Sequence, residues 1–167
     1  MARGLIVGCG CRGRSLGARL RGAGWQVRGT TRDPGTVDDI VSAGLEGVVA
    51  DPDRVGTVLD EIADVTLVFW LMGTATGDDE AVAAVHGPRL ERLMEELVDT
   101  PVRGVVYETG GSVPLELLGR GAEIVRTAAE RWRIPVAVVD ADPGEPDAWL
   151  EAMFAAAGRL TAAGRPV

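Results

Sequence analysis

Three glycines near the start of the chain have the spacing of a phosphate-binding loop. Gly8, Gly10 and Gly13 follow directly after the apolar run Leu5–Val7, and a helical pattern begins behind them. In a strand–turn–helix unit the first glycine permits the tight turn, the second lets the backbone approach phosphate, and the third lets the helix pack close to the strand. The free N–H groups at the positive end of that helix favour a negative charge. The stretch therefore predicts binding of the pyrophosphate of a dinucleotide.

The end of the second predicted strand, Trp25–Thr31, indicates which dinucleotide is bound. A site for NAD places a carboxylate there, which accepts from the 2′-hydroxyl of the ribose. Here the strand ends Thr30-Thr31-Arg32, and two hydroxyls beside a guanidinium fork suit a 2′-phosphate. Asp33 comes one position later and is expected to cap the next helix. We therefore predict NADP(H) rather than NAD(H) as the cofactor.

The third predicted strand, Glu46–Ala50, ends at a second candidate contact. Asp51 and Pro52 follow it directly. Asp51 either accepts from the amino group of adenine or caps the next helix, and Asp-Pro is a good helix start. Both roles fit the position. The helix is expected to run to about Ala63.

The longest apolar run, Val65–Met72, has the pattern of a central parallel strand buried on both faces. As the fourth strand of a doubly wound sheet, it lies across the point where the strand order reverses. Gly73 ends this strand, and the polar loop Thr74–Asp79 after it, with Met72 and Gly73 at the strand end, is therefore expected to border the ribose and the pyrophosphate.

Strands alternate with helices along the whole chain, which predicts a parallel sheet. The fold class is α/β: a doubly wound six-stranded sheet with helices on both faces, in one domain of residues 1–167. A Gly-Pro pair inside the helical segment Asp79–Val98 predicts a kink or break there. The other expected elements are the helices Arg12–Gly24, Thr36–Ala43, Leu115–Trp132 and Pro146 to about Ala163, and the strands Val102–Tyr107 and Pro135–Val139.

The composition limits the function classes. The chain has 167 residues, is 46% hydrophobic and carries a net charge of −8, which argues against nucleic acid or an anionic membrane as a general partner. No apolar run approaches the roughly 20 residues that a membrane span needs, and no signal peptide is visible, so a cytoplasmic location is the default expectation. All seventeen basic residues are arginine, which excludes any mechanism that needs a lysine amine.

Cysteine and histidine, the sulfur and nitrogen ligands of metal sites, are sparse. Cys9 and Cys11, the two cysteines, stand two residues apart inside the glycine loop, where a disulfide would be strained. They are expected to be small loop side chains, and Cys11 and Arg12 are counted with the cofactor site. His86 is the only histidine and has no companion ligand, so no metal site is predicted. It is either structural or a general acid or base.

The chain resembles the short-chain dehydrogenase/reductase superfamily, in its extended or atypical form related to nucleotide-sugar epimerases. This resemblance implies a Rossmann fold, a nicotinamide dinucleotide and, through the helical segment Val82–Leu97, a homodimer. The stretches that carry it are Leu5–Gly13, Thr31–Pro34, Asp51, Val105–Val113, Glu123–Arg126 and Ile134–Val139.

The chain departs from that family at the catalytic residues. The family's Tyr-x-x-x-Lys pair aligns with Leu115 and Gly119, and the only tyrosine, Tyr107, lies within a strand. The family's serine falls near Thr109, which keeps a hydroxyl. The chain also ends one helix after the sixth strand, so we expect a nucleotide-binding scaffold without the family's substrate portion.

Two functions remain open at this point. The first is an oxidoreductase that acts on a small carbonyl or hydroxyl compound or a nucleotide-sugar-like substrate, with Glu108, Thr109 and His86 as catalytic candidates and Ser112 and Asp140 nearby. Glu108 is then either an acid that burial keeps protonated or simply a solvated loop carboxylate. The second is a protein that binds NADP(H) without turning it over, as a sensor or a partner subunit.

Overall fold

Six parallel strands form one sheet in the order β3-β2-β1-β4-β5-β6. The computed structural model describes residues 1–163. The strand order reverses between β1 and β4, which makes the sheet doubly wound and confirms the predicted fold class. The predicted single domain covers residues 1–167, of which residues 164–167 lie outside the part of the chain that the structure describes. The strands are β1 (Arg3–Val7), β2 (Gln26–Thr31), β3 (Glu46–Val49), β4 (Leu67–Trp70), β5 (Gly104–Glu108) and β6 (Val136–Val139).

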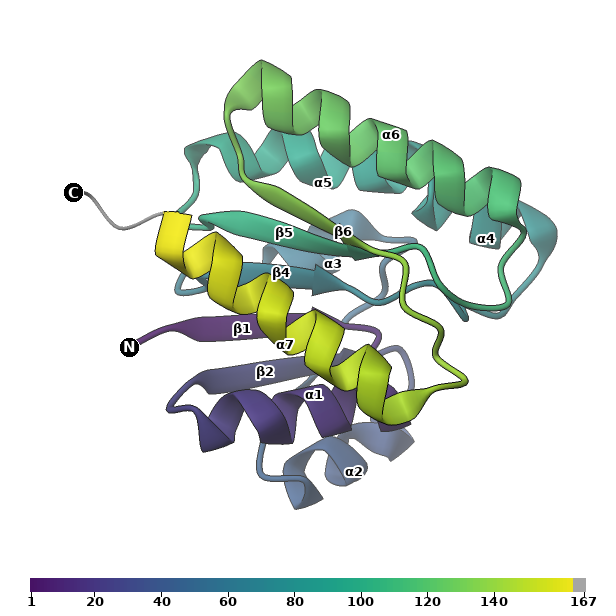
Figure 1. Cartoon of the computed structure of the whole chain (residues 1–167). Helices are drawn as coiled ribbons and strands as arrows, with labels where there is room; N and C mark the ends of the chain where they lie inside the picture. The colour runs from purple at the N-terminus through teal and green to yellow at the C-terminus, as the bar shows by residue number, and fades with distance from the viewer. Residues whose placement is uncertain (164–167) are drawn as a thin grey trace.

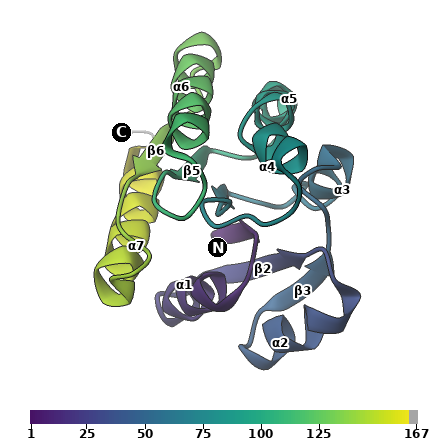
Figure 2. The ribbon, with the colours of Figure 1, turned by 90° about the vertical axis from the view of Figure 1, so that its right-hand side faces the viewer.

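Helices cover both faces of the sheet (Figures 1 and 2). One layer holds α1, α2 and α7, and in it α1 and α7 pack side by side. The opposite layer holds α3 to α6, and there α5 packs on α6. The helices are α1 (Cys11–Gly22), α2 (Val37–Ser42), α3 (Val55–Leu59), α4 (Asp79–Val85), α5 (Pro88–Glu96), α6 (Leu115–Trp132) and α7 (Pro146–Ala163), with 3₁₀ turns η1 (Pro34–Thr36) and η2 (Leu97–Asp99).

Strand residues alternate between two separate cores. Val68 and Trp70 of β4 face the layer of α3 to α6, whereas Leu67 and Phe69 face α1, α2 and α7. All four side chains are fully buried. A near-continuous apolar run is what a strand covered on both faces requires, so the expected burial of the fourth strand is confirmed.

The helix predictions with clear boundary signals are confirmed. α6 spans Leu115–Trp132 and α7 spans Pro146–Ala163, as expected. The predicted break also occurs, because α4 ends at Val85 and α5 begins at Pro88. Proline is tolerated in the first turn of a helix, where its missing N–H has no partner to lose.

The helix expected from Asp51 to Ala63 is wrong in its extent, because α3 covers only Val55–Leu59. The hydroxyl of Thr57 accepts from the N–H of Asp51 at 2.8 Å, which holds the start of the segment in a turn. At the other end, the carbonyl of Glu61 accepts from the guanidinium of Arg28 at 2.6 Å. The segment therefore turns to meet a strand side chain instead of continuing as a helix.

The fifth strand lies slightly later than predicted, at Gly104–Glu108 in place of Val102–Tyr107. Glu108 thereby becomes the last residue of β5 instead of the first residue of a loop. Within the described part of the chain, no helix combines the length and apolar character that a membrane crossing would need.

Candidate dinucleotide-binding site

The glycine loop has the geometry that its spacing predicts. Gly8 has φ +85°, and a Cβ on it would overlap Met72 and the Leu71 carbonyl, so only glycine fits. A Cβ on Gly10 would meet no atom within 4 Å, so the backbone there faces open space. A Cβ on Gly13 would lie 3.1 Å from Ile6 Cγ2, which keeps α1 close to β1. The loop therefore exposes its backbone where α1 begins.

Thr30 holds this loop from the neighbouring strand. Its carbonyl accepts from the N–H of Cys9 at 2.9 Å, and its hydroxyl accepts from the N–H of Gly8 at 3.3 Å. The side chain is 1% exposed. Of the two hydroxyls expected to meet a 2′-phosphate, that of Thr30 is therefore already engaged with the backbone of the loop.

A cavity of about 340 Å³ opens beside the glycine loop, between the C-terminal ends of β2, β3 and β4 and the start of α4. A smaller cavity of about 250 Å³ adjoins it at the N-terminus of α1, where Cys11, Arg12 and Gly13 line the wall. Gly73 is buried and lines neither of the two. The predicted residues that line the larger cavity are Gly8, Gly10, Thr30, Thr31, Arg32, Asp51, Pro52 and Met72.

The two cysteines of the loop differ in their surroundings. Cys9 is buried, and burial raises the pKa of its thiol to about 12. Cys11 is exposed at the first position of α1. Both thiols are free, so the structure contains no disulfide between them.

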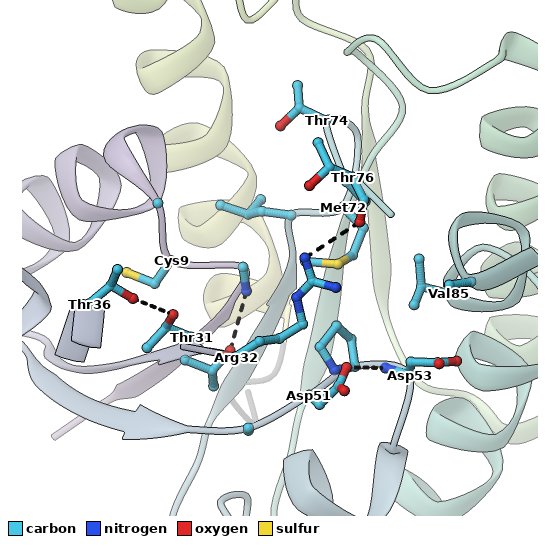
Figure 3. A pocket seen from close by; sticks show the side chains of 18 of the residues that line it. Cys9, Thr31, Arg32, Thr36, Asp51, Asp53, Met72, Thr74, Thr76 and Val85 are labelled. Carbon is cyan, nitrogen blue, oxygen red and sulfur yellow. Dashed lines mark hydrogen bonds between the residues drawn. The ribbon is translucent and has the colours of Figure 1, made fainter. Parts of the chain in front are cut away.

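The end of β2 carries a guanidinium rather than a carboxylate into the larger cavity (Figure 3). Arg32 is exposed and reaches across the cavity to the carbonyl of Thr76, at 3.4 Å. The carboxylate of Asp33 accepts from the N–H of Gly35 at 2.8 Å and caps η1, which confirms its predicted capping role. Asp33 does not line the cavity.

Asp51 lines the cavity just after β3, beside the end of β2, and its carboxylate accepts from the N–H of Asp53 at 2.9 Å (Figure 3). It does not cap a helix, because α3 begins at Val55, with Arg54 at the capping position. The capping alternative is therefore wrong. Contact with adenine stays a prediction.

Several residues of the cavity were not predicted. Thr74 and Thr76 come from the loop after β4, which was predicted to border the cofactor as a whole and without singling out these two residues. Thr36 also lines the wall, and its hydroxyl lies 2.6 Å from that of Thr31. Arg14, in the first turn of α1, adds a second cation. Its position one residue after Gly13 is a sequence signal that could have identified it.

A second polar cluster lies beneath the glycine loop, around Glu108. This carboxylate is fully buried and forms an ion pair with Arg12. It also accepts from the indole N–H of Trp149 at 2.9 Å and from the N–H of Gly73 at 3.1 Å. The alternative that Glu108 is a solvated loop carboxylate is therefore wrong.

Arg12 connects this cluster to the smaller cavity. Its guanidinium donates to the hydroxyl of Thr74 at 3.0 Å and lies over the ring of Trp149, 4.8 Å from the ring centroid. Trp149 comes from α7, and nothing in the pattern of that helix indicates that it contributes to the site. Arg12, Glu108 and Trp149 are called the Glu108 cluster below.

His86 and Tyr107 form a buried pair away from both cavities. His86 Nδ1 lies 2.6 Å from the hydroxyl of Tyr107, and Nε2 lies 2.8 Å from the carbonyl of Met72. Both side chains are fully buried, and burial raises the pKa of Tyr107 above its usual range. Both ring nitrogens of His86 have protein partners, so this pair connects β5 to the turn between α4 and α5.

The remaining catalytic candidates lie in the loops after β5 and β6. The hydroxyl of Thr109 donates to the carbonyl of Val139 at 3.2 Å, and the side chain is half-buried. Ser112 and Asp140 are exposed. Asp142 accepts from the N–H of Gly144 at 2.8 Å, which stabilises its own turn.

The buried His86 predicts a loss of stability in mild acid. Burial lowers its pKa below the ordinary value of 6.5, and the Met72 carbonyl and the charge of Glu108 offset this only in part. Below pH 6.5 the unfolded chain therefore binds a proton that the folded chain does not. The free energy of unfolding should fall as the pH drops from 7 towards 5, by up to about 1.4 kcal/mol per pH unit.

Urea unfolding of the wild type and of His86→Gln, compared at several pH values, measures this effect. The difference between the two free energies of unfolding reports on His86 alone, because both proteins contain the same carboxylates and these titrate in both. A difference that stays constant between pH 7 and pH 5 would contradict the proposed proton linkage.

Comparison with known proteins supports the fold. The sequence matches no family model and no curated protein. Solved structures with a similar fold include vestitone reductase from alfalfa (16% identity, TM-score 0.62), UDP-N-acetylglucosamine 4-epimerase from Bacillus cereus (14%, 0.63) and the triphenylmethane reductase of Citrobacter sp. in complex with NADP(H) (15%, 0.61). The alignments cover 83%, 83% and 81% of this chain, but only 56%, 53% and 48% of those chains.

The chain thus spans about half the length of these neighbours. At such low identity the likeness shows a common Rossmann fold. The neighbours are reductases and epimerases, which agrees with the resemblance found in the sequence.

Proposed function

We propose that this chain binds NADP(H), with the adenosine half of the dinucleotide in the larger cavity and the pyrophosphate at the N-terminus of α1. The observation that carries the proposal is the glycine loop at the point where the strand order reverses. This loop opens its backbone at Gly10 onto both cavities. Ligands of open α/β sheets bind at this point, outside the carboxyl ends of the strands.

The preference for the phosphorylated cofactor rests on charge. Arg32 and Arg14 bring two guanidinium groups to the larger cavity. A 2′-phosphate would accept from Arg32 in the fork geometry that this side chain offers. The first carboxylate after the end of β2, that of Asp33, accepts from the N–H of Gly35 and does not line the cavity.

Holding the cofactor without turning it over is the activity that the geometry favours. Tyr107 and His86 bind each other inside the core, and the Glu108 carboxylate has three donors of its own. A general acid must be within hydrogen-bond reach of the substrate, and these groups are occupied with one another. We therefore assign the chain a role as a sensor or partner subunit.

An atypical oxidoreductase is the second candidate function. It is supported by the similar fold of reductases and epimerases, one of them in complex with NADP(H). Among the predicted catalytic residues, Thr109 would then be the proton donor, because its half-buried hydroxyl lies just beyond β5.

A homodimer through α4 and α5 belongs to the same proposal. The family resemblance suggested this homodimer through Val82–Leu97, and the apolar residues Leu90, Leu93 and Met94 of that segment pack inside the chain. The exposed face of α5 is polar, with Glu91 and Arg92 at the surface. A dimer that used this face would therefore associate through charges, and high salt would dissociate it.

Isothermal titration of the purified protein with NADPH and NADH tests the proposed function. NADPH should bind at least about tenfold more tightly, because a hydrogen bond between charged groups contributes about 1.5–3 kcal/mol. Equal affinities would remove the role of Arg32, and the absence of binding by both would refute the proposal as a whole.

The same protein with NADPH and a set of small carbonyl compounds and nucleotide sugars separates the two candidate functions. A protein that binds NADPH without oxidising it leaves the absorbance of NADPH unchanged. Turnover that Thr109→Val abolishes would establish the second candidate in its place.

A further inference from the structure

The two cavities cover only one half of a doubly wound sheet. Such a sheet has two mononucleotide-binding halves, here β1–β3 and β4–β6, and a dinucleotide lies across the boundary between them. The walls of the larger and smaller cavities come from the glycine loop, the ends of β2, β3 and β4, and α2 and α4. Among the described residues, none that follows β5 or β6 belongs to either wall.

The loops over the second half are packed against each other, backbone to backbone. The N–H of Val113, after β5, donates to the carbonyl of Gly73, after β4, at 3.0 Å. A Cβ on Gly73 would overlap the carbonyl oxygen of Gly110, and a Cβ on Gly110 would overlap that of Ala141, after β6. The three loops therefore meet at distances that leave no room even for a methyl group.

Beneath these loops the Glu108 cluster fills the space between the sheet and α7. Glu108 is 0% exposed and Trp149 is 1% exposed. The ion pair with Arg12 and the hydrogen bonds from Trp149 and Gly73 satisfy the carboxylate without any ligand. A ring bound between these loops would have to displace Arg12 from the fully buried carboxylate of Glu108, and a buried charge without its partner is strongly unfavourable.

We infer that the site binds only the 2′-phospho-ADP-ribose portion of the dinucleotide and leaves the nicotinamide ring in solvent. This inference rests on the proposed function and specifies which chemical groups provide the affinity: the adenosine, its 2′-phosphate and the pyrophosphate. The protein then does not distinguish NADP⁺ from NADPH. It reports the total amount of the phosphorylated cofactor rather than its redox state.

Titration calorimetry with NADP⁺, NADPH and 2′-phospho-ADP-ribose tests the inference, because the last ligand lacks only the nicotinamide. The three dissociation constants should agree within about threefold, which corresponds to less than about 0.7 kcal/mol. Nicotinamide mononucleotide should not bind. The fluorescence of NADPH, which reports on the reduced ring, should stay close to that of the free compound in water.

Arg32→Glu provides the matched variant, because all three ligands carry the 2′-phosphate. It should weaken all three by the same factor. A variant that weakens NADPH alone would overturn the inference, because the ligands would then bind differently.

Two failures can be told apart. If NADPH or NADP⁺ binds more than about tenfold more tightly than 2′-phospho-ADP-ribose, the ring is bound and the inference is wrong, while the proposed function stands. If none of the three ligands binds, the proposed function itself is refuted.

Discussion

Glu108→Ala is expected to lower the free energy of unfolding by about 2–4 kcal/mol, because two buried N–H donors lose their acceptor and each unsatisfied buried donor costs about 1–3 kcal/mol. The carboxylate is fully buried, and its removal leaves Arg12 without its counter-charge and the indole N–H of Trp149 without an acceptor. The N–H of Gly73 loses its acceptor as well. Urea unfolding followed by circular dichroism measures the change.

Glu123→Ala is the matched control, because Glu123 is exposed on α6; such a surface change should stay within about 0.5 kcal/mol. If Glu108→Ala does not fold, Glu108→Gln keeps the shape and one acceptor and should lose about 1–3 kcal/mol. A loss below about 1 kcal/mol in Glu108→Ala would mean that water replaces the carboxylate.

Arg32→Glu should weaken the binding of NADPH by about 10- to 100-fold, since a hydrogen bond between charged groups contributes about 1.5–3 kcal/mol. The substitution also adds a carboxylate to a cavity that Asp39, Asp51 and Asp53 already line. NADH lacks the 2′-phosphate, so its affinity should change by less than about threefold, because the remaining charge interactions of an exposed side chain are weak. Calorimetry with both cofactors measures the two effects.

Arg126→Glu makes the same change of charge on the exposed surface of α6 and is the control for a general electrostatic effect. It should leave both affinities unaltered. An equal loss for NADPH and NADH in Arg32→Glu would indicate misfolding or a role at the pyrophosphate instead.

The parts of the fold that local physics determines could be predicted from the sequence. The apolar run of the fourth strand requires cover on both faces, and Gly87-Pro88 cannot continue a helix, so the central strand and the break between α4 and α5 follow directly. Glycine spacing likewise predicted the turn at Gly8 and the close packing at Gly13. Each of these inferences needs only neighbours along the chain.

The parts that depend on distant partners could not be predicted. Arg12 and Glu108 are 96 residues apart, and nothing in the local pattern of either residue indicates the other. The early end of α3 has the same origin, because Arg28 of β2 binds the carbonyl of Glu61. Trp149 lies within the predicted helix Pro146–Ala163, and the local pattern does not indicate that its indole N–H completes the Glu108 cluster.

The position of Arg12 makes the cavity and the packing of α7 energetically interdependent. Arg12 lines the smaller cavity and at the same time neutralises Glu108 and stacks on Trp149 of α7. An anion that draws the guanidinium towards the cavity must compete with Glu108. The coupling is reciprocal. The free energy by which the packing of α7 weakens anion binding equals the free energy by which the bound anion weakens the packing of α7. Binding of an anion at the N-terminus of α1 thereby affects the packing of α7, a helix on the other half of the sheet.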